Sequence, residues 1–344
     1  MILADYFEKV SDIERKAEEL PYHLELLAEE ERLRHCLLEW DVFNQLYNEE
    51  HSFDLLRYWQ KCGGYESAAK LYVDSLGTLK GSGSEKEFCD QQANVAFFLV
   101  QAGQYAESYR MLEECVNLEL DLFNGSRLIN LGELYGSMAL CQSQFVNLRQ
   151  NEASLQENID GRQKVVDLCK ESNKYRLQSG DAEQEYKTAT TNDLLCFQLT
   201  RIALMKDNKD DPVYQDEANS VIQHAMEVFT KFNMLGEVAR CIQTAQPIKA
   251  FTQENFEEQK AGYLKARDMC LKAYGENHKL YSSVTINTGD FFNAHQMYDE
   301  AYNFYVACEK CRMNIIGPDH PYTLDIQWIL RQEQYVAIKE QQSK

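Results

Sequence analysis

The stretch "IIGPDHPYTL" (residues 315–324) places Gly317, Asp319 and His320 close together, and an acid beside a histidine could carry acid–base chemistry. The stretch "AYGENHKLY" holds Gly275 and His278, each 42 residues before its counterpart. A turn that recurs at a fixed period is typical of stacked repeats. We therefore interpret both stretches as turns that begin the next helix, with Asn or Asp near the N-cap and, in the second, proline in the first turn.

No other motif predicts catalysis, a cofactor or a metal site. Cys308 and Cys311 form a lone CxxC, but no second ligand pair stands nearby, and Cys308 occupies a position that favours small packed residues. The stretch "GTLKGSGSEK" lacks the GxxxxGK[ST] order of a phosphate loop, and neither GxSxG nor HExxH occurs. We expect a protein that is not an enzyme and has no catalytic residues, metal or cofactor. The alternative from another class is a helical enzyme with its site in residues 140–250, for example around His224.

The segment between the two glycine turns predicts a helix pair. Gly289 is followed by Phe292 and then by Ala301, Tyr305 and Cys308, at 12, 16 and 19 residues from the glycine. Small residues let two antiparallel helices approach closely while aromatic residues fill the seam, which is the pattern of a tetratricopeptide (TPR) pair. The stretches "GGYESAAKLY", "GQYAESYRML" and "RLINLGELYG" repeat parts of it. The low counts of glycine and proline, 16 and 5 in 344 residues, also favour helices.

We predict an all-α fold, a right-handed superhelical TPR solenoid with an N-terminal helical cap. The cap covers residues 1–52, and TPR repeats cover 53–140. Less regular TPR-like helical pairs follow over 141–250, and further repeats with a C-terminal helix complete 251–344. Within the irregular part, the sequence predicts one long helix from about 140 to 170 and then a polar stretch over 171–192, which is a connection or the start of a helix.

An asparagine recurs on the predicted first helix of three repeats, two residues before its small residue, and the repeat at 53–76 has Asp54 in that place. First helices line the concave face of such a solenoid, and an amide can both donate to and accept from a peptide backbone. The bland interpretation is that asparagine is tolerated on an exposed helix or bonds within its own repeat. The predicted partner-binding groove consists of Asn94, Asn130, Asn287, Asp290, Glu133, Arg57 and Gln60.

Composition narrows the partner classes. The chain has 35 Lys and Arg against 55 Asp and Glu, a formal charge of −20, which repels nucleic acid and anionic lipid and attracts basic motifs. No apolar run approaches the roughly 20 residues that span a bilayer, and the N-terminus does not resemble a secretory signal. The 11 cysteines stand mostly inside apolar stretches, which indicates reduced core thiols and a cytoplasmic protein.

Two resemblances extend this prediction. The "GENH…GPDHP" spacing, with "NTGDFFNAHQMYDEAYNFYVAC" between, resembles the TPR repeats of kinesin light chains over residues 260–325 and partially over 53–140. The N-terminal "LADYFEKV" and "LPYHLELLAEEERLRHCLLEW" resemble the segment that leads into the repeats of NACHT-type (STAND) signalling ATPases with TPR tails, of the nephrocystin type. That resemblance implies a sensing or partner-binding tail. It does not carry over nucleotide switching, because the sequence has no ATPase motif.

From these observations we predict a non-catalytic protein–protein interaction scaffold that binds peptide segments in a concave groove. The alternative within the same class is a free-standing cargo adaptor like kinesin light chain. The expected partner is a protein or peptide with basic motifs. The sequence leaves its identity and the oligomeric state open.

Overall fold

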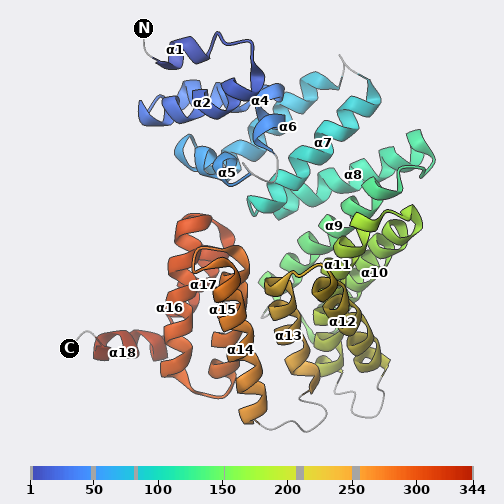
Figure 1. Ribbon diagram of the computed structural model, residues 1–344, viewed down its shortest axis with the longest axis vertical. Coiled ribbons are helices and arrows are strands. Elements are labelled where there is room, and N and C mark those ends of the chain that lie inside the picture. The colour runs from blue at the N-terminus through green and yellow to red at the C-terminus, as the bar shows by residue number, and fades with distance from the viewer. Residues whose placement is uncertain are drawn as a thin grey trace. The chain divides into compact units, whose positions relative to one another are not determined.

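The computed structural model describes residues 3–47, 52–80, 84–150, 152–206, 213–249 and 256–342. Over these residues the chain is helical and contains no strand, which confirms the predicted all-α solenoid class (Figure 1). The chain folds into two compact units. Unit 1 is Met1–Cys115 with Ile316–His320, and unit 2 is Val116–Ile315 with Pro321–Lys344.

Unit 1 contains seven helices of the described chain and most of an eighth. They are α1 (Leu3–Phe7), α2 (Ile13–Leu26), α3 (Glu30–Leu37), α4 (Trp40–Leu46), α5 (Ser52–Lys61), α6 (Gly64–Leu79), α7 (Glu85–Gln101) and α8 (Tyr105–Phe123). Its core is aromatic: Trp59 and Tyr72 are wholly buried with ring centroids 5.3 Å apart, and Tyr72 lies 5.0 Å from Phe43 and 5.7 Å from Phe98. The indole N–H of Trp59 donates to the Tyr72 hydroxyl at 3.0 Å, and that hydroxyl donates to the Leu37 carbonyl at 2.9 Å, so both buried polar groups are satisfied.

The segment Ile316–His320 also belongs to unit 1. The Tyr65 hydroxyl donates to the Ile316 carbonyl at 3.1 Å, and the His320 imidazole Nε2 lies 3.0 Å from the Gln101 carbonyl oxygen. Only 2% of His320 is exposed. The next helix begins at Pro321, so the stretch is the predicted turn, and its histidine is held by backbone and aromatic neighbours.

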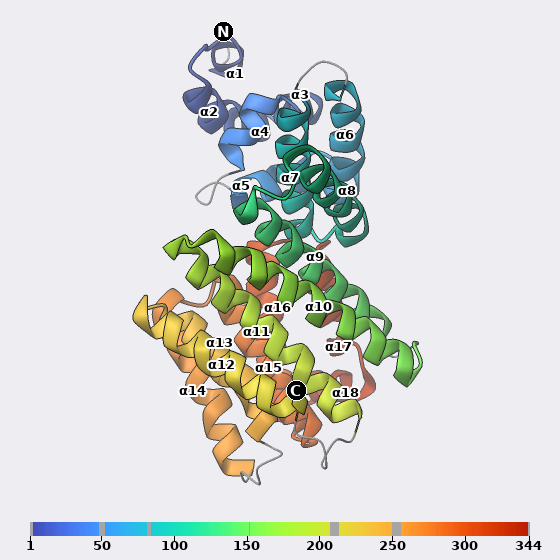
Figure 2. The same cartoon turned by 90° about the vertical axis from the view of Figure 1, so that its right-hand side faces the viewer.

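Unit 2 holds the remaining helices, which pack in sequence order (Figure 2). They are α9 (Leu128–Arg149), α10 (Leu155–Ser179), α11 (Ala182–Met205), α12 (Val213–Lys231), α13 (Leu235–Lys249), α14 (Phe256–Tyr274), α15 (Lys279–Ala294), α16 (Tyr298–Ile315), α17 (Pro321–Leu330) and α18 (Glu333–Gln342). In addition, α9 contacts α11, α11 contacts α13, and α13 contacts α15. We call these four helices the first-helix layer, because each is the first helix of its pair.

Helices α15 and α16 pack closely together, as the small residues at their contact predict. A methyl group on Gly289 would lie 2.7 Å from the ring of Tyr305, so only glycine lets the two helices approach this closely. Ala301 and Cys308 are fully buried at the same seam. His278 is the N-cap of α15 and accepts from the Leu280 N–H at 3.2 Å, which is the helix-start role expected of that turn.

Two predictions in the irregular region are wrong. The expected long helix over residues 140–170 breaks, because α9 ends at Arg149 and α10 begins after the N-cap Ser154, whose hydroxyl forms a capping box with Glu157. For the polar stretch over 171–192, the prediction of a connection is wrong, since α10 continues to Ser179, and the prediction of a helix start is right, since α11 begins at Ala182. Polar side chains in that stretch, among them Arg176, point inward.

All eleven cysteines are buried and none forms a disulfide, as their apolar surroundings predict. In the described part of the chain, no helix is both long and apolar enough to cross a membrane. The same residues contain no group of three or more His, Cys, Asp or Glu side chains placed to hold a metal ion.

Candidate partner-binding surface

The first-helix layer of unit 2 presents a stripe of accessible side chains on α15. Ser283, Ile286, Asn287 and Asp290 recur at helical spacing and are exposed or half-exposed. The residues between them, including Val284, Thr288 and Gly289, are buried against neighbouring helices. The stripe therefore faces away from the core. It contains two of the predicted groove residues, Asn287 and Asp290.

Asn287 is attached to the helix beside it. Its Nδ2 donates to the Gln243 Oε1 at 3.3 Å, and Gln243 in turn donates to the Val284 carbonyl at 2.7 Å and to the Thr288 hydroxyl at 2.9 Å. Gln243 lies on α13 and is only 2% exposed. The buried amide thus fixes the orientation of Asn287 on the surface of α15.

Asp290 has an unusual environment for an exposed carboxylate. Its Oδ1 accepts from the Tyr305 hydroxyl at 2.8 Å, a contact that lowers its pKa. Loss of hydration among the surrounding atoms is the larger effect and raises the pKa of Asp290 from 3.8 to about 6. Asp290 is thus accessible to solvent, although neighbouring protein atoms displace part of the water around its carboxylate.

The predicted groove residues on α9 are engaged within the protein. Asn130 donates from Nδ2 to the Glu119 carboxylate at 3.3 Å, and with its amide turned over, its oxygen would accept from the Arg127 Nε at 3.1 Å. Glu133 accepts from the Lys187 Nζ at 2.5 Å, which ties α9 to α11. Asn130 thus fits the bland interpretation of an amide that bonds locally, whereas Asn287 remains accessible.

The other three predicted residues lie in unit 1. Arg57 on α5 forms ion pairs with Glu25 at 3.3 Å and Asp54 at 3.1 Å. Gln60, one turn later, donates to the Tyr65 hydroxyl at 2.7 Å and to the Ile316 carbonyl. Asn94 on α7 is half-buried. Each unit therefore contains part of the predicted set.

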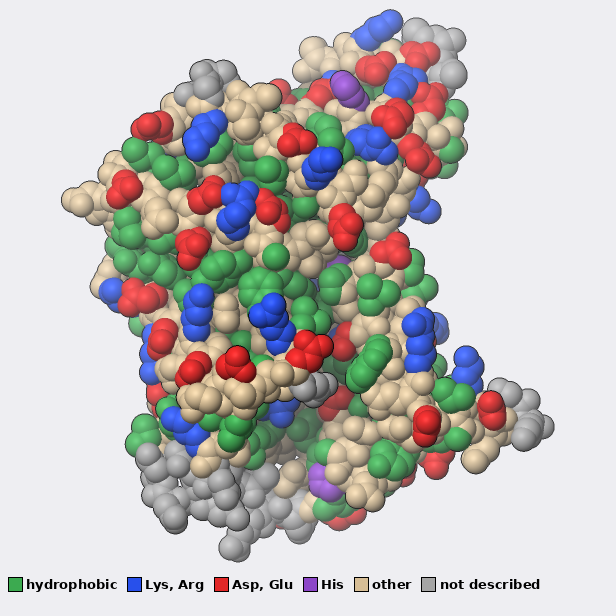
Figure 3. Space-filling model, turned by 180° about the vertical axis from the view of Figure 1, so that it is seen from behind, with side chains coloured by type: hydrophobic (Ala, Val, Ile, Leu, Met, Phe, Trp, Pro, Cys, Tyr) green, Lys and Arg blue, Asp and Glu red, His purple; other side chains and the backbone are tan. Residues whose placement is uncertain are grey.

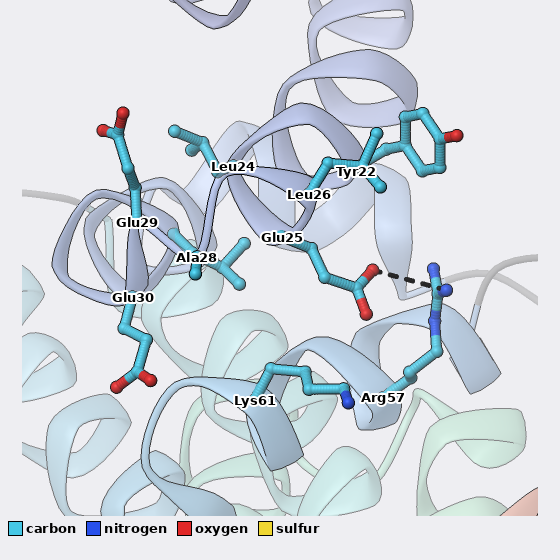
Figure 4. A pocket seen from close by; sticks show the side chains of 10 residues that line it. Tyr22, Leu24, Glu25, Leu26, Ala28, Glu29, Glu30, Arg57 and Lys61 are labelled. Atoms are coloured by element: carbon cyan, nitrogen blue, oxygen red, sulfur yellow. Dashed lines mark ion pairs between the residues drawn. The ribbon is translucent and has the colours of Figure 1, made fainter.

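Arg57 also lines a pocket of unit 1 with a volume of about 490 Å³ (Figure 4). The pocket lies where α2 ends, α3 begins and α5 passes. Figure 4 shows Arg57 and Lys61 on one helix opposite Glu25, with Glu29 and Glu30 on a separate wall. The lining is completed by Tyr22, Leu24, Leu26, Ala28 and Leu33. Glu25 and Glu29 are already paired, with Arg57 at 3.3 Å and Arg32 at 2.7 Å, so most of its charge is satisfied internally.

The sequence patterns did not predict a second accessible stripe, which lies on α11. It consists of Thr190, Leu194, Phe197 and Arg201, which recur at intervals of four, three and four residues and are half-buried or exposed. Almost all of the remaining positions on the second half of α11 are buried. The interval pattern was available in the sequence, but the polar residues between these positions, such as Asn192 and Gln198, are also buried and obscure it.

These observations define the class of protein: an all-helical protein whose helices pack in sequence order, consistent with TPR-type repeats, with accessible stripes on its first-helix layer. No protein-family model matches the chain, and no curated protein matches it. Among solved structures, it is similar to the Signal Transduction ATPase with Numerous Domains (STAND) protein with a tetratricopeptide repeat sensor from Pyrococcus horikoshii, with 13% identity and a TM-score of 0.43. The match covers 98% of this chain and 47% of that chain, so this chain spans about half of its length.

Proposed function

We propose that this protein is a non-catalytic protein-interaction scaffold that binds a peptide segment across the first-helix layer of unit 2. The observation that carries the proposal is the accessible stripe on α15, where Asn287 and Asp290 stand between wholly buried positions. Asn287 is oriented by Gln243, and Asp290 is poorly hydrated, so both groups are prepared to contact a ligand. Ile286 on the same stripe supplies apolar area beside them.

The wider roles suggested by the sequence belong to the same proposal. A sensing or partner-binding tail of a signalling ATPase and a free-standing cargo adaptor both require a partner surface of this kind. A cytoplasmic location and a partner of protein rather than nucleic acid fit the charge of −20. The rival enzyme centred on residues 140–250 has less support, because His224 is exposed and its Nδ1 faces the Asn192 amide at 3.2 Å.

A peptide-display selection tests the proposal. Wild-type protein is panned against a random 12-residue phage library, and the enriched peptides are synthesised and titrated by fluorescence anisotropy. Asn287→Arg places a bulky charge on the stripe and is expected to weaken binding about 10-fold or more. Asn219→Arg is the matched control, since Asn219 is an exposed asparagine on α12, outside the first-helix layer. Failure to enrich any peptide, or equal binding by both variants, would overturn the proposal.

A further inference from the structure

Arg201 has no anionic partner among the described residues. It lies on the accessible stripe of α11, and its guanidinium carbon is 5.5 Å from the centre of the Phe197 ring. Its Nε is shielded from solvent and has no hydrogen-bond partner in the described part of the chain, where no carboxylate lies within ion-pair distance. A partly dehydrated charge that is not paired is costly to maintain, and a ligand carboxylate would offset this cost.

Asp290 on α15 is a carboxylate that also lacks an oppositely charged partner among the described residues. The only hydrogen bond to its carboxylate within the described chain comes from the Tyr305 hydroxyl, and none of the described cations pairs with it. Arg201 and Asp290 do not pair with each other, although they are near enough for the arginine charge to lower the pKa of the carboxyl against the larger effect of dehydration. The two helices are separated within the layer by α13, which contacts both. Each charge is therefore left for a separate group of a ligand.

The opposite charges of Arg201 and Asp290 do not favour a wholly basic ligand, and basic side chains also occur elsewhere on the surface. Figure 3 shows Lys and Arg side chains interspersed with Asp and Glu side chains on the face it presents, despite the strongly acidic composition. A run of basic residues laid across the layer from α15 to α11 would satisfy Asp290 but would approach Arg201 with a like charge. Repulsion of that kind is a common source of specificity.

We propose that the bound segment carries both signs of charge, with an acidic side chain against Arg201 and a basic side chain against Asp290. This inference rests on the proposed function and specifies its ligand. It replaces the simple preference for basic motifs that the net charge suggests. The two contacts also fix the direction of the segment, because reversing the peptide would place like charges together at both ends.

The test uses the peptides enriched on the wild-type protein. Arg201→Gln is expected to weaken binding roughly 3- to 10-fold and to abolish the effect of replacing the peptide's acidic residue by glutamine. Asp290→Asn, which keeps an oxygen for Tyr305, is expected to act likewise on the basic residue. The double variant Arg201→Glu/Asp290→Lys is expected to prefer a peptide in which the two charged residues are exchanged.

Lys265→Gln on α14 and Asp299→Asn on α16 are controls of the same charge change at exposed positions. The peptide-side substitutions keep the test valid even if a protein variant folds poorly. If enriched peptides respond to Asn287→Arg but change less than 2-fold with both Arg201→Gln and Asp290→Asn, the inference is wrong and the proposed function stands. Enrichment of wholly basic peptides would likewise overturn the inference and leave the proposed function in place. If no peptide responds to Asn287→Arg, the proposed function itself fails.

Discussion

The two units of this protein join their helices by different chemistry. In unit 1 the contacts are aromatic, and Trp59, Tyr72 and Phe98 are wholly buried. In the first part of unit 2 the contacts are polar: Arg162 on α10 is fully buried and donates to the Gln198 Oε1 of α11 at 2.8 Å, while Gln198 donates to the Ser143 hydroxyl of α9 at 2.9 Å. The same repeat architecture can therefore be held by an apolar seam or by a chain of hydrogen bonds.

We call the contacts of Arg162, Gln198 and Ser143 the polar junction. It contains a buried charge, whereas the aromatic core of unit 1 does not. Burial, with a smaller contribution from the nearby Arg201, lowers the pKa of Arg162 to about 10, and no described carboxylate offsets these effects. The arginine is thus still charged at neutral pH. A buried charge held only by amide oxygens specifies which helices meet, but it does not add the stability that an apolar seam provides. This difference predicts that substitution costs more in unit 1 and that a second, apolar substitution can restore stability in unit 2.

The largest effect is expected in unit 1. Trp59→Ala removes a wholly buried side chain and the hydrogen bond from its indole to Tyr72, and it should lower the free energy of unfolding by about 3–5 kcal/mol. Urea denaturation followed by circular dichroism measures this. Trp328→Ala is the control, because 58% of Trp328 is exposed, and a change below about 1 kcal/mol is expected there. Similar losses at the two tryptophans would contradict the apolar account of unit 1.

The polar junction of unit 2 should behave differently. Arg162→Met leaves the Gln198 oxygen buried without a donor and is expected to cost about 1–3 kcal/mol. Adding Gln198→Leu removes the orphaned amide, so the double variant should regain the wild-type stability or exceed it. The same denaturation assay measures both variants. A double variant that is less stable than Arg162→Met would show that the junction stabilises the fold beyond specifying it.

A smaller effect concerns the turn between α2 and α3 in unit 1. Ala28 has a φ of 53°, and the bonds from Glu29 N–H to the Leu24 carbonyl and from Ala28 N–H to the Glu25 carbonyl form the hydrogen-bond pattern of a Schellman C-cap, a place that favours glycine. Ala28→Gly should therefore stabilise the protein by about 0.5–1 kcal/mol. Ala261→Gly, at an exposed position inside α14, should instead cost about 1 kcal/mol. If Ala28→Gly and Ala261→Gly shift the melting temperature in the same direction, the backbone of Ala28 is not strained.

The last prediction concerns a titration in unit 2, which is measured without any substitution. Because the pKa of Asp290 is raised to about 6, its contribution to stability is fully present below about pH 4 and is lost as the pH rises through 6. Carboxyl NMR should give a midpoint near 6. The facing groups are Tyr305 and Arg312 on α16, Asp325 on α17, and Arg201. Asp325→Asn should lower the midpoint and Tyr305→Phe should raise it, while an ordinary midpoint in the wild type would contradict the dehydration of Asp290.

The sequence predicted the aromatic and small-residue pairs well and the polar ones poorly. The seam around Gly289 and Tyr305 follows from residue size, which a spacing pattern records directly. Arg162 and Arg176 look like solvent-facing residues in a sequence, yet both are buried, and Arg176 lies in the stretch for which a polar connection was one prediction. The break between α9 and α10 did have a visible signal, the capping pair Ser154 and Glu157.

The candidate surface was predictable in part. Helical spacing alone identifies the α15 stripe, and Asn287 and Asp290 lie on it. Pairing between distant helices is not encoded in local spacing, so the sequence could not show that Asn130 and Glu133 are engaged by Glu119 and Lys187. For the same reason it could not show that Arg201 has no partner among the described carboxylates.

The buried cysteines offer a consequence of a different kind. Thiols occur in almost every helix pair, from Cys36 in α3 to Cys311 in α16, and burial raises the pKa of several of them, to about 12 for Cys36, Cys169 and Cys270. A thiol reagent can therefore reach each one only when its own repeat opens. Labelling followed by mass spectrometry would time these openings along the chain, using reporters that the protein already contains.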